Sequence, residues 1–222
     1  MLDCGPKTTD QWNIMDKRYW KKYYNKKSKP ASPSNFAKFV KDKHATEKGR
    51  LLELGCGNGR DVIFFSSHGF YVVGIDQCED EISFLQKEFG NKKLKFISGD
   101  FTNLEHDEEY DYIYSRFTLH SISEKEESRV INWAYDHLLK GGKFFIEARD
   151  LQNEYYGLGE PVKGQKHAYH YEGHFRRFID LSEIIDKLSS VAFKIDYFAE
   201  QSGFAPFEDT DYKYIRTVAS KQ

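Results

Sequence analysis

The sequence predicts an α/β domain in which a seven-stranded, mostly parallel sheet has helices on both faces. From residue 50 onward, short apolar runs alternate with segments whose apolar residues recur at helical spacing. A glycine-rich turn follows the first of these runs, and glycines close several of the helical segments. Such alternation is typical of parallel strands joined by covering helices. A chain of 222 residues is long enough to form one such domain with a substantial core.

The segment before residue 35 is predicted to form an N-terminal helical cap followed by a linker. Asp10 is placed to cap a helix whose apolar and aromatic residues recur at helical spacing, namely Trp12, Met15, Tyr19 and Tyr23. Residues 17–29 are rich in Lys and Arg and contain no acid, and residues 28–34 are rich in Pro and Ser. The helix is interpreted as an amphipathic helix on the domain, a lid, or a patch for an anionic partner. We therefore divide the chain into residues 1–34, a cap or lid with its linker, and residues 35–222, the main domain.

The remaining elements follow in order along the chain. A short helix is expected from residue 35, and the predicted strands are 50–54, 71–76, 94–100, 110–117, 143–150, 193–200 and 212–220. The predicted helices between them are 60–69, 79–90, 123–142 and 180–190. Capping boxes mark two helix starts, Ser123 with Glu126 and Asp180 with Glu183. Residues 151–178 show no clear periodicity, and because long loops in compact domains are often functional, we expect this insertion to contribute to a site.

The composition argues against several kinds of partner and indicates a cytoplasmic protein. Lys plus Arg total 33 and Asp plus Glu total 35, and the net charge of −2 gives no sign of a nucleic-acid binder. The three cysteines, Cys4, Cys56 and Cys78, form no CxxC pair, which suits reduced thiols in a cytosol. The N-terminus lacks the apolar core of a signal peptide, and no run approaches the ~20 apolar residues of a membrane span.

The segment "LLELGCGNGRD" has the features of a nucleotide site. Gly55, Gly57 and Gly59 follow a strand directly, where glycines allow close approach of the backbone to a ligand at a helix start. Glu53 precedes the first glycine by two residues, and Asp76 ends the next strand, where an acid can hold a pair of ribose hydroxyls. Asp100 ends the third strand and can accept from an exocyclic amine, or it can cap a helix instead.

The order GxGxG differs from the GxGxxG of dinucleotide-binding folds and resembles the class I S-adenosylmethionine-dependent methyltransferases. The matching segments are "ELGCGNG", "GID", "GDF", "YDYIYSRFTLHSI" and "LLKGGKFFIEAR", so the resemblance covers about residues 50–150. It implies a Rossmann-like fold with S-adenosyl-L-methionine as cofactor, and the last two strands fit the family's antiparallel hairpin. The cofactor-binding residues that it implies are Glu53, Gly55, Gly57, Gly59, Asp76, Asp100, Phe101 and Ser115. The elements "SRFTLH" and "HFRRF" further resemble methyltransferases associated with surface polysaccharides and sugar modification.

Candidates for the acceptor side should follow the fourth and fifth strands. Methyl transfer is an in-line displacement that requires an aligned acceptor, and a hydroxyl acceptor must also lose its proton to a base. His120 follows the fourth strand and has an ordinary pKa that suits a base near neutral pH. Asp150 ends the fifth strand and can take a proton itself or orient His120. The structural alternative for His120 is a histidine packed at a helix start, and the alternative for Asp150 is a turn residue. Glu147 and Arg149 form either a buried ion pair or surface charges.

The stretch "YEGHFRRF", residues 171–178, ends the insertion just before the helix capped by Asp180. We expect His174 and one of Arg176 and Arg177 to bind the acceptor, with the other arginine paired to surface acids. Arg149 and the aromatic residues Tyr19 and Tyr23 complete the predicted acceptor site. A metal is not expected, because the histidines at 167, 170 and 174 lie on no clear helix and the insertion has few carboxylates.

The predicted function is O-methylation of a sugar hydroxyl on a glycan or nucleotide sugar. The alternative within the class is N- or O-methylation of a small metabolite such as an amine or a phosphonate. Two further alternatives are a nucleic-acid methyltransferase and a non-catalytic S-adenosylmethionine-binding protein. The first is favoured only by the basic N-terminal run. The sequence predicts neither the oligomeric state nor whether the acceptor is a monomer or a polymer.

Overall fold

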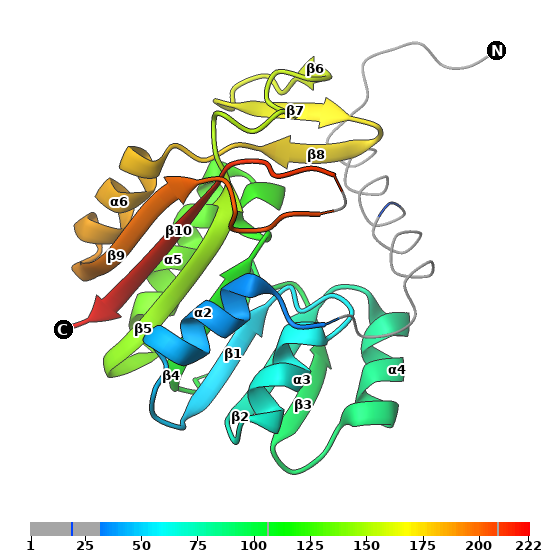
Figure 1. Cartoon of the computed structure of the whole chain (residues 1–222), viewed down its shortest axis with the longest axis vertical. Coiled ribbons are helices and arrows are strands. Elements are labelled where there is room, and N and C mark those ends of the chain that lie inside the picture. The colour runs from blue at the N-terminus through cyan, green and yellow to red at the C-terminus, as the bar shows by residue number, and fades with distance from the viewer. Residues whose placement is uncertain (1–18, 20–31, 106, 208) are drawn as a thin grey trace.

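A seven-stranded sheet forms the centre of the computed structural model, which describes residue 19 and residues 32–105, 107–207 and 209–222. Its strands are β1 (Arg50–Leu54), β2 (Tyr71–Asp76), β3 (Leu94–Ser98), β4 (Tyr110–Arg116), β5 (Leu138–Arg149), β9 (Phe193–Gln201) and β10 (Tyr214–Lys221). The strand order is β3-β2-β1-β4-β5-β10-β9 (Figure 1). The first five strands pair in parallel, whereas β10 is antiparallel to both β5 and β9. The predicted mostly parallel α/β sheet with an antiparallel last strand is confirmed.

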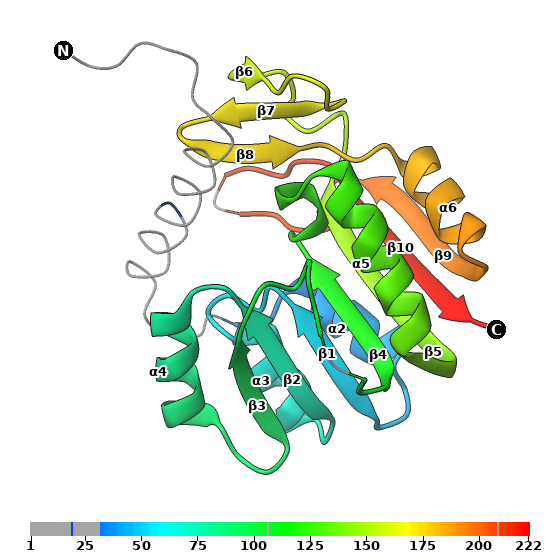
Figure 2. The ribbon, with the colours of Figure 1, turned by 180° about the vertical axis from the view of Figure 1, so that it is seen from behind.

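Helices cover both faces of this sheet, as predicted. They are α2 (Asn35–Lys43), α3 (Arg60–Ser67), α4 (Glu79–Phe89), α5 (Glu124–His137) and α6 (Leu181–Ser190), together with the short 3₁₀ helix η1 (Leu119–Ser121). One buried apolar cluster contains side chains of α2, α3 and α4, and a second contains side chains of α5 and α6. Figure 2, seen from behind, shows α5 and α6 in front of the sheet, with α2 and α3 on the other face.

The N-terminus of α2 is fixed to α3 by a buried polar group. The Ser34 backbone N–H and hydroxyl donate to the two carboxylate oxygens of Asp61, at 2.8 and 2.7 Å, and the Tyr114 hydroxyl donates to the same carboxylate at 2.9 Å. Ser34 also accepts from the Ala37 N–H as the helix cap. A buried carboxylate needs several donors, and Asp61 has these three. These hydrogen bonds join the start of α2 to the first turn of α3, directly after the glycine-rich turn.

The predicted helix 123–142 is too long at its C-terminal end. Its capping box of Ser123 and Glu126 is present, but α5 ends at His137 and β5 begins at Leu138. Gly141, with φ 80°, lies in β5 where the register with β4 shifts, so the two glycines form a strand irregularity instead of a helix stop. At α6 the Asp180 side chain accepts from the Ser182 and Glu183 backbone N–H groups and caps the helix.

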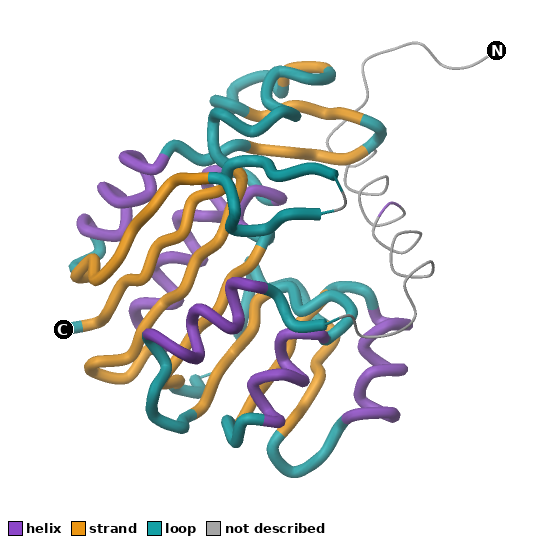
Figure 3. Tube along the Cα trace, in the orientation of Figure 1, coloured by secondary structure: helices purple, strands orange, loops and turns teal. Residues whose placement is uncertain are grey.

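The insertion contains regular structure that its sequence did not predict. It forms a three-stranded antiparallel sheet of β6 (Glu160–Pro161), β7 (Ala168–Tyr171) and β8 (His174–Arg177) (Figure 3). Glu172 and Gly173 have φ values of 54° and 73°, so they form the two-residue turn typical of a β-hairpin. The stretch "YEGHFRRF" is therefore a hairpin strand. The small sheet lies beyond the carboxyl ends of β4 and β5 (Figures 1 and 2).

The structure describes little of the predicted N-terminal cap. The N-terminal cap lies outside the described residues except for Tyr19, and Tyr23 lies outside them entirely. Within the described part of the chain, no helix has both the length and the apolar character needed to cross a membrane.

Candidate active site

The glycine-rich turn and Asp76 form a buried unit at the carboxyl ends of β1 and β2. Gly55, Gly57 and Gly59 have φ values of 67°, 53° and 76°, a region that favours glycine. The Gly57 N–H donates to Asp76 Oδ2 at 3.0 Å, and the Cys78 N–H donates to Asp76 Oδ1 at 3.0 Å. Burial raises the pKa of Asp76, and these backbone hydrogen bonds oppose the rise. Asp76 thus holds the turn in the position that the sequence predicted for a nucleotide site.

Glu53 supplies a second acid beneath the turn. Its side chain is buried on β1, and its Oε2 has no hydrogen-bond partner among the described residues. Burial, followed by the neighbouring Asp61, raises the pKa of Glu53 well above its usual range. A buried acid with a free oxygen and a glycine turn with positive φ values fit a bound S-adenosylmethionine. Glu53, the three turn glycines and Asp76 would hold the polar parts of that cofactor.

The other predicted cofactor residues lie around the same turn. A Cβ placed on Gly55 would lie 2.4 Å from Thr118 Cγ2 and 3.6 Å from Phe101 Cε1, so both side chains lie against the turn. The buried Ser115 shares a 2.5 Å hydrogen bond with Thr118. Asp100 is exposed, and its Oδ1 accepts from the Thr102 N–H and hydroxyl, both at 2.8 Å. Among the described residues no helix starts directly after Asp100, so it closes a local turn and does not cap a helix, and its contact with the adenine remains a prediction.

His120 is buried in a state that does not suit a general base. Its Nδ1 accepts from the Arg149 backbone N–H at 3.0 Å, so in the neutral ring the proton is on Nε2. Burial, followed by the charges of Arg149, His174, Arg177 and Arg176, lowers the pKa of His120 well below its usual range. The ring is neutral at physiological pH and offers an N–H donor. We correct the predicted base role accordingly, because the nitrogen that could take a proton is already occupied.

Asp150 makes no hydrogen bond with His120 among the described residues. Its Oδ1 accepts from the Gln152 N–H at 3.0 Å, while its buried Oδ2 has no hydrogen-bond partner among the described residues. Burial, followed by the neighbouring Glu200, raises the pKa of Asp150 to about 6. The second predicted role, orientation of His120, is wrong because neither Asp150 oxygen accepts a hydrogen bond from that ring. Asp150 is instead a carboxyl that titrates close to neutral pH.

The predicted pair of Glu147 with Arg149 is also wrong. Glu147 is buried and accepts from Arg116 Nε at 2.8 Å and from Arg216 Nε at 2.6 Å. Arg149 lies near Glu147 in sequence, but its Nη1 donates to Asn153 Oδ1 at 3.1 Å. A carboxylate between two guanidinium groups on β4, β5 and β10 fixes the strand ends beneath the insertion.

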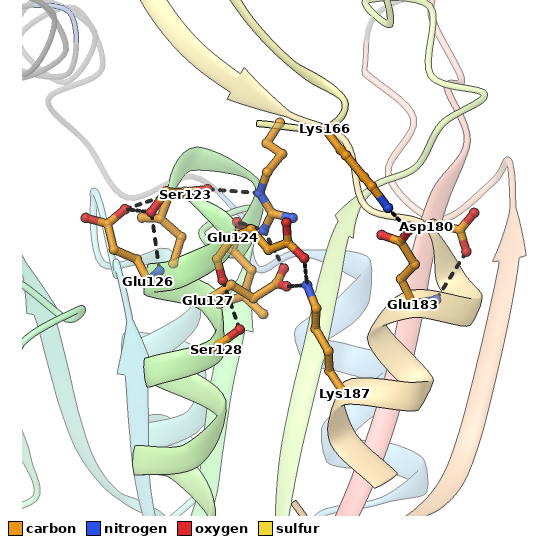
Figure 4. A network of polar contacts seen from close by, with 12 residues as sticks. Ser123, Glu124, Glu126, Glu127, Ser128, Lys166, Asp180, Glu183 and Lys187 are labelled. Atoms are coloured by element: carbon orange, nitrogen blue, oxygen red, sulfur yellow. Dashed lines mark hydrogen bonds and ion pairs between the residues drawn. The ribbon is translucent and has the colours of Figure 1, made fainter. Parts of the chain in front are cut away.

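Arg177 anchors the insertion to the main domain. Its guanidinium donates to the Leu119 and Ile122 carbonyls, each at 3.0 Å, and forms a close ion pair with the buried Glu127. Glu127 also accepts from Lys187 at 2.8 Å, so α5, α6 and β8 meet in one network (Figure 4). The acceptor-binding role predicted for Arg177 is corrected to a structural one, because its Nε and Nη2 donate to the main domain and its charge is paired with Glu127. Its partner is thus a buried acid of α5 and not one of the surface acids expected from the sequence.

His174 and Arg176, by contrast, share the other face of β8. The rings of His174 and Tyr19 stack with centroids 4.4 Å apart and an angle of 8° between their planes. The Arg176 guanidinium lies over the rings of Tyr155 and Tyr171, at 4.6 and 5.2 Å. The structure thus brings together Tyr19, His174, Arg176 and Arg149, four of the residues predicted for the acceptor.

The sequence did not single out the rings that complete this group. Arg149 lies over Tyr155, Tyr214 and Phe117, at 5.1, 5.9 and 6.0 Å, and the rings of Phe117 and Tyr214 stack. Phe117 has a φ of 61°, which is rare for a bulky residue and marks the end of β4 as a constrained position. A high aromatic content was the only sequence signal for these residues.

The histidines of the insertion do not form a metal centre. Among the described residues, no group of three or more His, Cys, Asp or Glu side chains is arranged to hold a metal ion. His167 instead shares a 2.8 Å hydrogen bond with the Tyr156 hydroxyl.

Comparison with known proteins identifies similar methyltransferases. A family model described as tellurite resistance protein TehB matches residues 12–159, more than half of the chain. An uncharacterized methyltransferase of Staphylococcus carnosus is 27% identical over 122 residues, which cover 55% of this chain and 58% of that protein. The cypemycin N-terminal methyltransferase of a Streptomyces species is 30% identical over 110 residues, which cover 48% of this chain and 45% of that protein. The matched region is thus about half of the length of these curated relatives.

A solved structure shows the same fold over the whole chain. The 1,6-didemethyltoxoflavin-N1-methyltransferase of Burkholderia thailandensis was solved with 1,6-didemethyltoxoflavin and S-adenosylhomocysteine. It aligns with a TM-score of 0.75 and 17% identity over 100% of this chain and 93% of that chain. Identity this low shows a shared fold and leaves the acceptor open.

Proposed function

The chain belongs to the TehB family of S-adenosylmethionine-dependent methyltransferases, and we propose that it transfers the methyl group of that cofactor to a small acceptor beside β8. In this displacement the lone pair of the acceptor forms the bond to the methyl carbon. The carbon–sulfur bond breaks with its electrons on sulfur, which leaves S-adenosylhomocysteine. The chain's own task is to hold both partners in line and to exclude water.

The acceptor that the geometry supports best is a nucleophile that needs no protein base, such as an amine. One observation carries this proposal: His120, which follows β4, is neutral and offers only an N–H donor, because the Arg149 backbone occupies its Nδ1. Arg149 and Arg176 are also donors. The name of one similar protein, the cypemycin N-terminal methyltransferase, agrees with a nitrogen acceptor.

This proposal is tested by following S-adenosylhomocysteine formation across a panel of acceptors. The panel holds small amines, phosphonates, sugars, nucleotide sugars and RNA, together with tellurite because of the family's description. Turnover with amines or other free nucleophiles, and none with sugars, is the expected outcome. Turnover with sugar hydroxyls alone would contradict it.

A sugar hydroxyl of a glycan or nucleotide sugar is the second candidate acceptor. Asp150 favours it, because its pKa of about 6 and the free Oδ2 suit a carboxylate that takes a hydroxyl proton near neutral pH. The association with glycan modification rests on short sequence elements, so it stays part of this proposal.

The two candidates predict different pH profiles. Asp150 is protonated below pH ~6 and ionised above it, so a hydroxyl methylation that uses this base should rise in rate as the pH passes through about 6. Asp150→Asn should then lower kcat by roughly 100- to 10,000-fold and remove that rise. For an amine acceptor we expect Asp150→Asn to leave kcat nearly unchanged. The measurement is kcat from pH 5 to 9 in both proteins, with circular dichroism to verify the fold.

Tyr19 and His174 are expected to affect the acceptor and not the cofactor. Stacked aromatic pairs contribute ~0.5–1.5 kcal/mol, so Tyr19→Ala and His174→Ala should each raise the acceptor KM by roughly 2- to 10-fold. Calorimetry should show unchanged affinity for S-adenosylhomocysteine. Tyr71→Ala is the matched control, because this exposed tyrosine begins β2, at the end of the strand away from Asp76 and the site. A lower melting temperature with an unchanged KM would make His174 a structural residue and move the acceptor elsewhere.

A further inference from the structure

Arg149 and Arg176 differ from the neighbouring arginines in their partners. Arg116 and Arg216 pair with the buried Glu147, and Arg177 pairs with the buried Glu127. Arg149 forms no ion pair within the part of the chain that the structure describes. Within the same described residues, the one carboxylate near Arg176 is that of the exposed Glu172, at 4.0 Å, the outer limit of an ion pair. Among the described residues, two positive charges are thus held in the site without a close carboxylate.

The two guanidinium groups contact the same aromatic ring. Both lie over the ring of Tyr155, Arg149 at 5.1 Å and Arg176 at 4.6 Å from its centroid. Tyr171 contacts Arg176 at 5.2 Å, and Asn153 accepts from Arg149 at 3.1 Å. Rings and amides orient a guanidinium and leave its charge uncancelled. Two like charges on one ring repel each other, so this arrangement costs stability in the free protein.

Arg176 also has a buried donor without an acceptor. The side chain is 8% exposed, and its Nη1 has no hydrogen-bond partner among the described residues. A buried, unsatisfied donor on a charged group is expensive, and such groups are otherwise found paired. Arg176 lies on the face of β8 that also carries His174, so the unused donor belongs to the acceptor side of the site.

We propose that Arg149 and Arg176 form a subsite for an anionic group, a carboxylate or a phosphate, that is carried by the methyl acceptor. The proposal rests on the proposed methyl transfer only in that it assigns the anion to the acceptor. An anionic group would accept from the free Nη1 of Arg176 and would lower the repulsion between the two guanidinium groups. The subsite therefore selects acceptors that carry a negative charge away from the methylated atom.

The anion subsite is tested by titrating the full chain with phosphate and with acetate, using calorimetry at constant ionic strength set with chloride. At least one of the two anions should bind the wild-type protein, and the tighter one identifies the class of group. Arg176→Gln should weaken its binding by about 10- to 100-fold, because charge-assisted hydrogen bonds are lost. The anion affinity of Arg176→Lys should lie between those of the wild type and Arg176→Gln, since lysine keeps the charge and loses the fork of donors. Arg129→Gln, which changes an exposed arginine on α5, should bind as the wild type does.

The same samples separate this subsite from the methyl transfer itself. S-adenosylhomocysteine should bind equally well to the wild type and to both Arg176 variants, which also verifies their fold. If it binds and neither phosphate nor acetate does, the anion subsite is wrong and the methyl transfer is unaffected. Anion binding that is equally tight in Arg176→Gln also overturns the subsite. If the anions bind as expected and S-adenosylhomocysteine does not, the subsite stands and the cofactor assignment falls.

Discussion

Gly57→Val should abolish cofactor binding in a protein that still folds. Gly57 has a φ of 53°, where a β-branched residue is strained by roughly 1–3 kcal/mol, and its N–H donates to Asp76. Any relaxation of that strain moves the N–H away from the carboxylate and places two methyl groups beside the turn. We expect the affinity for S-adenosylhomocysteine, measured by calorimetry, to fall by at least about 100-fold. The variant loses both the shape of the turn and the hydrogen bond from residue 57 to the Asp76 carboxylate.

The matched control is Gly141→Val. Gly141 has a φ of 80°, with no other atom within 4 Å of a Cβ placed on it, and it lies in β5 near the opposite end of the sheet. This variant carries a similar backbone strain, so it should lose stability while keeping its affinity for S-adenosylhomocysteine. Equal losses of affinity in both variants would mean that general destabilisation, and not the turn, controls binding.

Glu127→Ala should be strongly destabilising. Glu127 is 0% exposed and pairs with Arg177 and Lys187 (Figure 4). Removal of one partner of a buried ion pair leaves an uncompensated charge and typically costs ~3–5 kcal/mol. For a chain of this length that corresponds to a decrease in melting temperature of roughly 6–20 °C. Differential scanning calorimetry measures the decrease directly.

Glu124→Ala gives the comparison for that result. Glu124 also pairs with Lys187, at 2.9 Å, but it is half exposed, and such pairs contribute about 1 kcal/mol or less. Arg177→Lys should lower the melting temperature as Glu127→Ala does, because one ammonium cannot reach two carbonyls and a carboxylate together. A stable Glu127→Ala protein with an altered acceptor KM would instead return Arg177 to the acceptor site.

The features predicted from sequence are those that local rules determine. The spacing of Gly55, Gly57 and Gly59 predicts a turn with positive φ values, and the end of an apolar run predicts the position of Asp76. The capping box at Ser123 is an equally local pattern. Parallel strand order follows from alternation with helices, so the sheet and its ligand-binding edge could be derived before any coordinates.

The features that were missed depend on contacts between distant segments. Arg177 and Glu127 lie 50 residues apart, so no spacing rule connects them. The turn at Glu172 lacks the Asn-Gly or Asp-Gly pair that signals a hairpin, which concealed β7 and β8. The role of His120 is decided by the backbone N–H of Arg149, which no side-chain pattern records.

Methyl transfer itself is the central claim, and one measurement tests it most directly. The 222-residue chain is incubated with S-adenosylmethionine and each acceptor of the panel, and both products are followed by mass spectrometry. We predict that at least one acceptor gains the mass of one methylene group in equal amount to the S-adenosylhomocysteine formed, and that Gly57→Val forms neither product. Failure of the folded wild-type protein to bind S-adenosylmethionine, or binding without any methylated product across the panel, would contradict the account.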